Sequence, residues 1–112
     1  MIGRVSLHRW DELPLEKITE MVSRKVIRSA QAQLTQAYYK KGAVVPLHAH
    51  RTDVMVYILQ GALRTSVEGV DVTAREGEVV VVAAGASHQA ECLDDTFVLT
   101  FMGFEEPLRP AS

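Results

Sequence analysis

The sequence predicts an all-β fold, built as a sandwich or barrel of short strands. Short segments rich in Val, Ile, Thr and Tyr follow one another from Ala32 onward. Glycine-containing turns separate these segments at Gly42, Gly61, Gly69 and Gly77. Strands at such close spacing are typical of architectures in which each strand buries one face against a second layer.

The N-terminal part of the chain is expected to hold strands at the edge of this sheet structure. Gly3–His8 is expected to form a first edge strand, and Trp10–Pro14 a loop, because proline lacks an amide donor. Leu15–Met21 has the length of a helical turn, although so short a helix is not stable by itself. Ser23–Ser29 and Ala32–Tyr39 alternate polar and apolar residues, which predicts strands.

From residue 42 onward we expect strands divided by tight turns. Glu78–Val82 contains four consecutive valines, and this uniform run predicts a strand buried on both faces. Glu105–Ser112 contains two prolines and is expected to be a loose tail. The other strands are expected at Val54–Leu59, Ala62–Val67, Val70–Ala74, Gln89–Leu93 and Thr96–Phe104.

Composition and charge exclude several classes of protein. The chain has 112 residues and a net charge of −2, which indicates neither a nucleic acid nor a membrane as partner. Its one cysteine, Cys92, excludes an internal disulfide and favours a reducing compartment. No signal-peptide pattern or membrane-length apolar run is present. We therefore expect a cytoplasmic protein with a single domain over residues 1–112.

Three histidines suggest a metal site. His48 and His50 are two residues apart, so on an extended strand both side chains point to the same face. A third imidazole, His88, would complete one face of a divalent ion and leave open positions for water or substrate. Asp53 is a candidate fourth ligand only if a bulge redirects it, because strict alternation turns it outward. A His-x-His pair alone is more often part of an ordinary half-exposed surface.

The same alternation predicts an apolar pocket beside the histidines. Val54, Val56 and Ile58 share strand parity with His48 and His50, and their side chains favour a hydrophobic ligand over a polyhydroxylated sugar. The other candidates for the pocket lining are Tyr39, Gln89, Cys92 and Met102.

Two stretches, residues 42–61 and 77–92, resemble the paired motifs of the cupin superfamily, the RmlC-like proteins. The first motif reads Gly-x5-His-x-His-x3–4-Glu-x6-Gly, and the second reads Gly-x5-Pro-x-Gly-x2-His-x3-Asn. Two long patterns that agree together are far more specific than a lone motif. The positions that match are Gly42, His48, His50, Gly61, Gly77, Gly85 and His88, whereas Val54, Ala83 and Cys92 replace the family's Glu, Pro and Asn.

A narrower resemblance extends over nearly the whole chain. Trp10–Pro14, Lys41–Pro46 and Leu93–Thr96 are similar to segments of the small cupins of pectin and alginate breakdown, which open unsaturated uronate rings. The chain departs from those enzymes at the position of the fourth metal ligand. It departs from them also at the polar and aromatic positions of the last strand. The residues at these departures are Val54, Thr100, Met102 and Glu106.

The resemblance implies a double-stranded β-helix, or jelly-roll barrel, with His48, His50 and His88 in its mouth. It implies a divalent metal ion, Zn, Fe, Ni or Mn, and a small organic substrate. Three activities remain open: opening of uronate rings or sugar isomerisation, dioxygenation at a three-histidine iron centre, and non-catalytic ligand binding or sensing. It also implies a homodimer, with the N-terminal strands of residues 1–41 at the interface.

Overall fold

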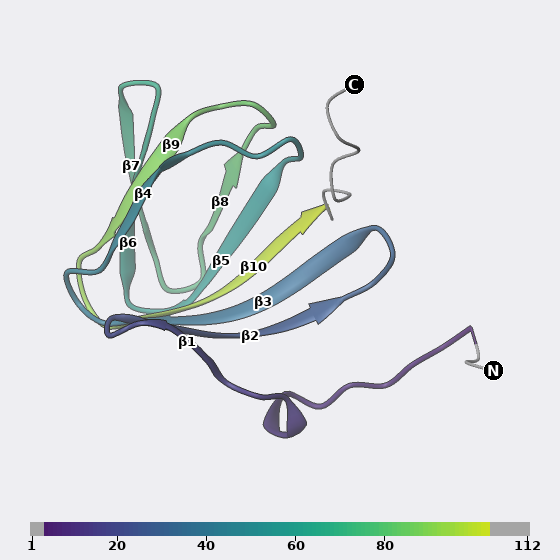
Figure 1. Ribbon diagram of the computed structural model, residues 1–112. Helices are drawn as coiled ribbons and strands as arrows, with labels where there is room; N and C mark the ends of the chain where they lie inside the picture. Colours follow the sequence, from purple (N-terminus) through teal and green to yellow (C-terminus); the bar gives the residue numbers. More distant parts are fainter. Residues whose placement is uncertain (1–3, 104–112) are drawn as a thin grey trace.

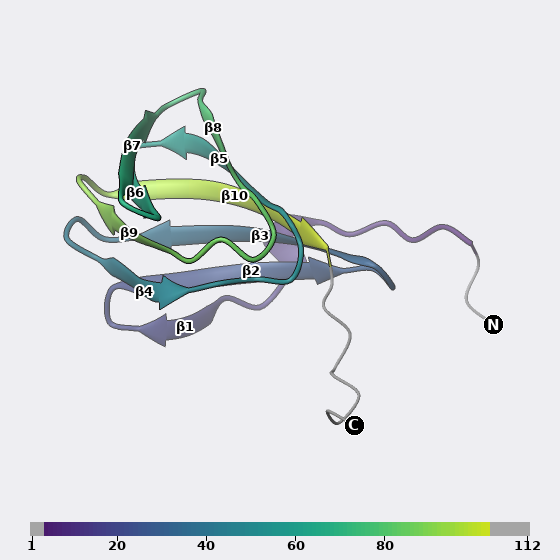
Figure 2. The same ribbon diagram turned by 90° about the horizontal axis from the view of Figure 1, so that it is seen from above.

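The computed structural model describes residues 4–103 and shows two antiparallel sheets facing each other (Figures 1 and 2). The larger sheet has the strand order β1-β2-β3-β10-β5-β8, and the smaller has the order β4-β9-β6-β7. This arrangement confirms the predicted all-β jelly roll. The strands are β1 (Glu16–Thr19), β2 (Val22–Arg28), β3 (Ala32–Tyr39), β4 (Val44–His48), β5 (Val54–Gln60), β6 (Ala62–Val67), β7 (Val70–Arg75), β8 (Val79–Val82), β9 (His88–Cys92) and β10 (Thr96–Gly103).

The core lies between the two sheets. Because successive side chains of a strand point to opposite faces, each sheet contributes every second residue to it. Ile58 of β5, Val98 of β10 and Cys92 of β9 are almost completely inaccessible to solvent. The core therefore joins both sheets at the end of the barrel where β5 turns into β6.

Leu15–Met21, which has the length of a helical turn but was not expected to be a stable helix, contains a strand. Glu16–Thr19 forms β1, which pairs antiparallel with β2 through Glu16 and Arg24. An isolated helical turn gains few hydrogen bonds, whereas the open edge of β2 supplies ladder partners. Trp10–Glu12 forms a single 3-10 turn, η1, within the expected loop.

Two further expectations from the sequence are wrong. Residues 4–8 are extended but form no strand, and Figure 1 shows the segment before η1 running away from the sheets. In β8 only Val80 and Val82 are buried, whereas Val79 and Val81 face solvent. The reason is that β8 is an edge strand, and no second layer from residues 4–103 covers its outer face. Phe104 and the expected tail Glu105–Ser112 lie outside the described residues.

Among residues 4–103, no helix has the length and apolar character needed to cross a membrane.

Candidate metal centre

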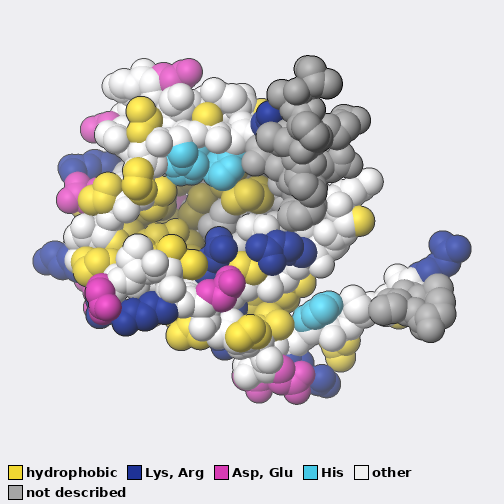
Figure 3. Space-filling model, in the orientation of Figure 1, with side chains coloured by type: hydrophobic (Ala, Val, Ile, Leu, Met, Phe, Trp, Pro, Cys, Tyr) yellow, Lys and Arg dark blue, Asp and Glu magenta, His cyan; other side chains and the backbone are white. Residues whose placement is uncertain are grey.

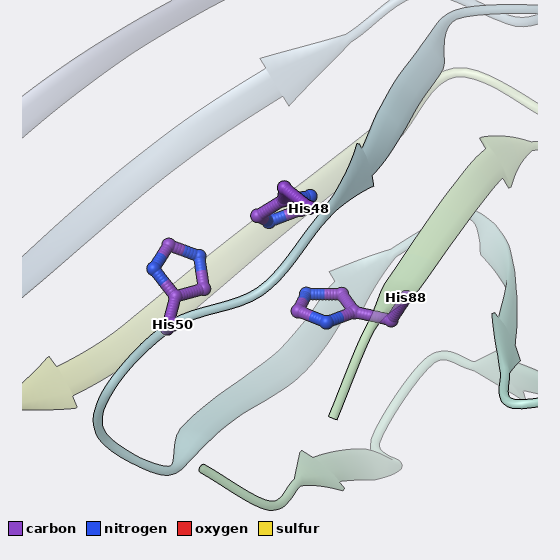
Figure 4. Close-up of side chains that lie close together, drawn as sticks. All are labelled: His48, His50 and His88. Carbon is purple, nitrogen blue, oxygen red and sulfur yellow. The ribbon is translucent and has the colours of Figure 1, made fainter. Parts of the chain in front are cut away.

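Three histidines converge at the open end of the barrel (Figure 4). His48 is the last residue of β4, His88 is the first residue of β9, and the two face each other in the β4–β9 pair. His50 follows in the loop after β4. The centroid of the His48 ring lies 4.2 Å from that of the His88 ring and 4.7 Å from that of the His50 ring. One potential ligand atom from each residue lies within 4.8 Å of the other two.

A bulge in β4 directs His48 into the barrel. Val45 pairs with Ala90 and His48 pairs with His88, so three steps along β4 match two steps along β9. Pro46 lies within this irregularity, where its missing N–H costs the ladder no hydrogen bond. The extra residue reverses the alternation. His48 therefore faces the cavity, and Leu47 faces solvent.

Backbone carbonyls determine the tautomers of two of the histidines. Nδ1 of His48 lies 2.8 Å from the carbonyl oxygen of Pro46, and Nδ1 of His88 lies 3.0 Å from that of Ala86. A carbonyl only accepts hydrogen bonds, so each Nδ1 carries the proton and donates it. The lone pair then resides on Nε2, which is the arrangement that outer hydrogen bonds impose on metal-binding histidines.

The cluster fits a transition-metal ion by size and by donor type. A tetrahedral ion with metal–nitrogen bonds of about 2.0–2.1 Å holds its ligand nitrogens about 3.4 Å apart. The potential ligand atoms of the three histidines lie within 4.8 Å of one another, so side-chain movements of roughly 1 Å would bring them to the spacing that a bound ion requires. Neutral imidazoles suit Zn, Cu, Fe and Ni better than hard cations.

Asp53 lies outside this cluster and has a different place in the structure. It is exposed, and its Oδ1 accepts a hydrogen bond of 2.8 Å from the N–H of Ala84. The N–H of Gly85 donates a second bond of 2.8 Å to the carbonyl of His50. Together these bonds join the loop of His50 to the loop that leads into His88. Asp53 thus supports the site from outside it, as alternation along the strand suggested.

A cavity of about 140 Å³ lies beside the three imidazoles. Four of the expected pocket residues, Tyr39, Val54, Val56 and Met102, line it with the histidines. Thr100, which occupies a position where the resemblance expected a polar functional group, also lines it. The described lining contains no carboxylate.

Three expected pocket residues do not line this cavity. Ile58 and Cys92 have the inward parity but lie deeper, where they are sealed in the core. Gln89 is exposed on the outer face of β9, because it is one residue away from the inward-facing His88. Parity predicts the face of a strand correctly, but it does not predict depth along the barrel.

Sequence reasoning missed part of the cavity wall. Val80 and Val82 of β8, Ala90 of β9 and Val98 of β10 line it without having been assigned to it. The available signal was alternation: Ala90 has the same parity as His88, and Val98 the same parity as Met102.

Two ionisable groups near the site stay uncharged at neutral pH. Burial raises the pKa of the Cys92 thiol to about 11, although a hydrogen bond with Thr96 acts in the opposite direction. Burial also raises the pKa of Tyr39, with Cys92 adding to the effect and the charge of Arg24 opposing it. Neither group therefore brings a negative charge to the cavity.

These features define the class of protein: an antiparallel jelly-roll barrel with a histidine cluster at its mouth. The family model described as "Cupin domain" matches residues 36–102. The chain belongs to the cupin family, which confirms the resemblance seen in the sequence.

Solved cupin structures have the same fold over almost the whole chain. KdgF from Halomonas sp. matches with a TM-score of 0.81 and 23% identity, covering 95% of this chain and 96% of its own. An RmlC-like cupin from Shewanella frigidimarina gives a TM-score of 0.81 and 20% identity, covering 95% of both chains. A predicted oxalate decarboxylase from Thermotoga maritima gives 0.77 and 23%, covering 89% of this chain and 100% of its own. At these identities the likeness shows the fold alone. A search of curated protein sequences finds no match.

Proposed function

We propose that the protein is a metal-binding small cupin, with His48, His50 and His88 holding one divalent transition-metal ion beside a pocket for a small organic molecule. The observation that carries this proposal is the convergence of three imidazoles, two of which direct a lone pair from Nε2. When bound, such an ion supplies Lewis acidity at its open positions.

The residues of the chain determine which ions and molecules suit the site. Three neutral nitrogen donors without a carboxylate favour Zn, Fe and Ni over Mn, which prefers oxygen ligands. Val54, Val56 and Val80 line the cavity with apolar side chains, which suits an apolar body placed beside the histidines. Tyr39 and Thr100 supply hydroxyl groups on the same wall.

Of the possible activities, opening of uronate rings is the one that the cavity supports least. Val54, Thr100 and Met102 stand where the similar sugar-acid cupins have their functional groups, and no described lining residue is a carboxylate. The remaining departure, Glu106, lies outside the described residues. The three-histidine donor set is compatible with an iron dioxygenase and equally with a non-catalytic binding protein.

Metal analysis tests the proposal directly. We expect the purified chain to retain about one transition-metal ion, and equilibrium dialysis to rank Zn and Ni above Mn. Failure to bind any of these ions above pH ~6.5, where imidazole is mostly neutral, would overturn the proposal. Oxygen uptake by the iron-loaded protein with a thiol or diketone would identify a dioxygenase. Loss of unsaturated-uronate absorbance would identify ring opening.

Removal of the Asp53 side chain is expected to weaken metal binding without removing a ligand. Asp53→Ala breaks the hydrogen bond to the Ala84 N–H and loosens the two loops that carry His50 and His88. Outer groups of this kind typically contribute about 10–100-fold in metal affinity. Because Asp53 is exposed, we expect the lower end, about tenfold, in a competition titration against a chromophoric chelator.

Asp53→Asn provides the matched control. Its amide oxygen still accepts the Ala84 N–H, so its zinc affinity should stay close to that of the unmodified chain. An equal loss in both variants would indicate that the charge of Asp53 matters rather than the loop contact.

We also propose that two copies associate through the N-terminal region. The extended segment exposes Val5 and Leu7, and Leu15 is exposed just before β1, which is an edge strand among the described residues. Light scattering is expected to give twice the mass of one chain, and Leu7→Lys is expected to shift the protein toward the monomer. Leu47→Lys, a substitution at another exposed leucine outside this region, should leave the mass unchanged. A monomeric mass for the unmodified chain at micromolar concentration would contradict the proposal.

A further inference from the structure

The cavity beside the histidines opens into a second groove. This groove has a volume of about 330 Å³ and runs between the β1–β2–β3 end of the larger sheet and β4. Tyr39, Val45, His48, Thr100 and Met102 line both spaces, so a bound molecule can extend from one to the other. The histidine cluster therefore lies at one end of a longer binding surface.

The groove is mainly apolar but carries one strong charge. Its walls include Ile18, Val22, Val44 and Met102. Among the described residues that line it, Arg24 alone has a permanently charged side chain. Figure 3 shows this face hollowed and hydrophobic, with histidine on one rim and Lys or Arg side chains on the opposite rim. Positive charge thus stands across an apolar floor from the candidate metal centre.

Strand geometry explains why Arg24 faces the groove. Along β2, Arg24 has the same parity as Val22, and both line the groove. The next residue, Lys25, points to the other face, where its ammonium donates a 2.8 Å hydrogen bond to the carbonyl of Trp10. Arg24 pairs in register with Ala37 of β3, which is also a lining residue.

The hydrogen bond between Arg24 and Glu16 uses only one N–H group of the guanidinium. Its Nε donates a 3.1 Å hydrogen bond to Oε1 of Glu16 on β1. Both side chains are substantially exposed, at 36% and 48%, and exposed ion pairs contribute little to stability. A guanidinium has four further N–H donors, arranged to hold a carboxylate by two parallel bonds. An incoming carboxylate can therefore bind Arg24 at little cost to the fold.

We infer that the groove selects small molecules with a carboxylate at one end, which Arg24 binds while the apolar body extends toward His48. A single guanidinium on an apolar surface matches the charge of a carboxylate, whereas a phosphate dianion would need additional donors. Arg24 is thus a specificity-determining residue. The inference rests on the proposed function for the role of the histidine end of the site.

The experiment compares hexanoate with hexanamide, two probes of equal chain length that differ in charge. The protein is kept metal-free, so that no metal ion competes for the carboxylate, and binding is followed by NMR titration. We expect hexanoate to bind about tenfold more tightly than hexanamide, the usual scale for a charge-assisted pair. Arg24→Gln should abolish this preference, and Arg24→Lys should retain part of it because the charge remains.

Arg64→Gln is the matched control. Arg64 is similarly exposed and forms an ion pair with Glu91, but it lies away from the groove. It should keep the full preference for hexanoate. No preference in the unmodified chain, or an equal preference in Arg24→Gln, would overturn the inference.

Zinc titration of the same samples separates the two proposals. If zinc binds and the preference for carboxylate does not depend on Arg24, the metal-centred function stands and the inference is wrong. If the preference depends on Arg24 and zinc does not bind, the groove selects carboxylates as inferred and the proposed metal function is wrong.

Discussion

His48→Ala is expected to lower the affinity for zinc by at least about 100-fold, because it removes one of three ligands and leaves a site with two protein nitrogens. His48 stands at the centre of the cluster, paired with His88 across the β4–β9 ladder and in edge contact with His50. The remaining imidazoles have ring centroids 5.8 Å apart. Competition with a chromophoric chelator measures the change.

The fold of this variant should remain intact. His48 is only half buried and lies at the end of a strand, so its removal empties part of an open cavity rather than the core. Zinc at 100 times its dissociation constant should stabilise the unmodified chain by about 2.7 kcal/mol. This zinc-dependent stabilisation should disappear in His48→Ala, while the metal-free stability of the two chains remains similar.

His8→Ala is the control for this prediction. His8 is the one histidine of the chain outside the cluster. It is exposed in the N-terminal segment and contacts the hydroxyl of Ser6. Its replacement should leave zinc binding unchanged. A loss shared by His8→Ala, or zinc binding that survives in His48→Ala, would place the metal elsewhere.

Gly61→Ala is expected to cause the largest loss of stability, about 3 kcal/mol or more. Gly61 forms the corner at which the chain passes from β5 in one sheet to β6 in the other, and its φ is +94°. A Cβ there would lie 2.3 Å from the carbonyl oxygen of Asp95 and 2.8 Å from the Cα of Thr96. Both obstacles are backbone atoms, so relief requires a shift of β10 itself.

The hydrogen bonds around this corner make such a shift costly. Thr96 is buried, and its hydroxyl oxygen accepts the N–H of Ala62 over 3.3 Å. The single hydroxyl proton faces two carbonyl acceptors, that of Asp94 at 2.8 Å and that of Ala62 at 3.1 Å. Displacing β10 also disturbs the contact of Val98 with the core. Urea unfolding measures the resulting loss in the free energy of unfolding.

Gly69→Ala separates the steric effect from backbone strain. Gly69 also has a positive φ, of +87°, but a Cβ at this position would meet no atom within 4 Å. Its replacement should cost about 1 kcal/mol, from the strained conformation alone. Equal losses at the two glycines would show that the contact with Asp95 and Thr96 adds nothing.

Local patterns predicted most strands correctly. Ala32–Tyr39 and Ala62–Val67 were expected and are observed with the same bounds, since alternation and glycine turns specify short strands from nearby residues alone. The errors occurred where distant residues decide the outcome. Glu16–Thr19 forms a strand because β2 supplies hydrogen-bond partners. β8 is half exposed because no layer within the described part of the chain covers its outer face.

The sequence by itself determined that the protein is a β-barrel with three histidines at motif spacing, because turn residues, strand parity and ligand type are properties of short segments. Only the tertiary structure decided which side chains share a cavity. The bulge at Pro46 turned His48 inward, the depth of the barrel removed Ile58 and Cys92 from the pocket, and β2 placed Arg24 in the groove that continues from the histidines. These outcomes depend on register and packing between strands far apart in the chain, which no local pattern contains.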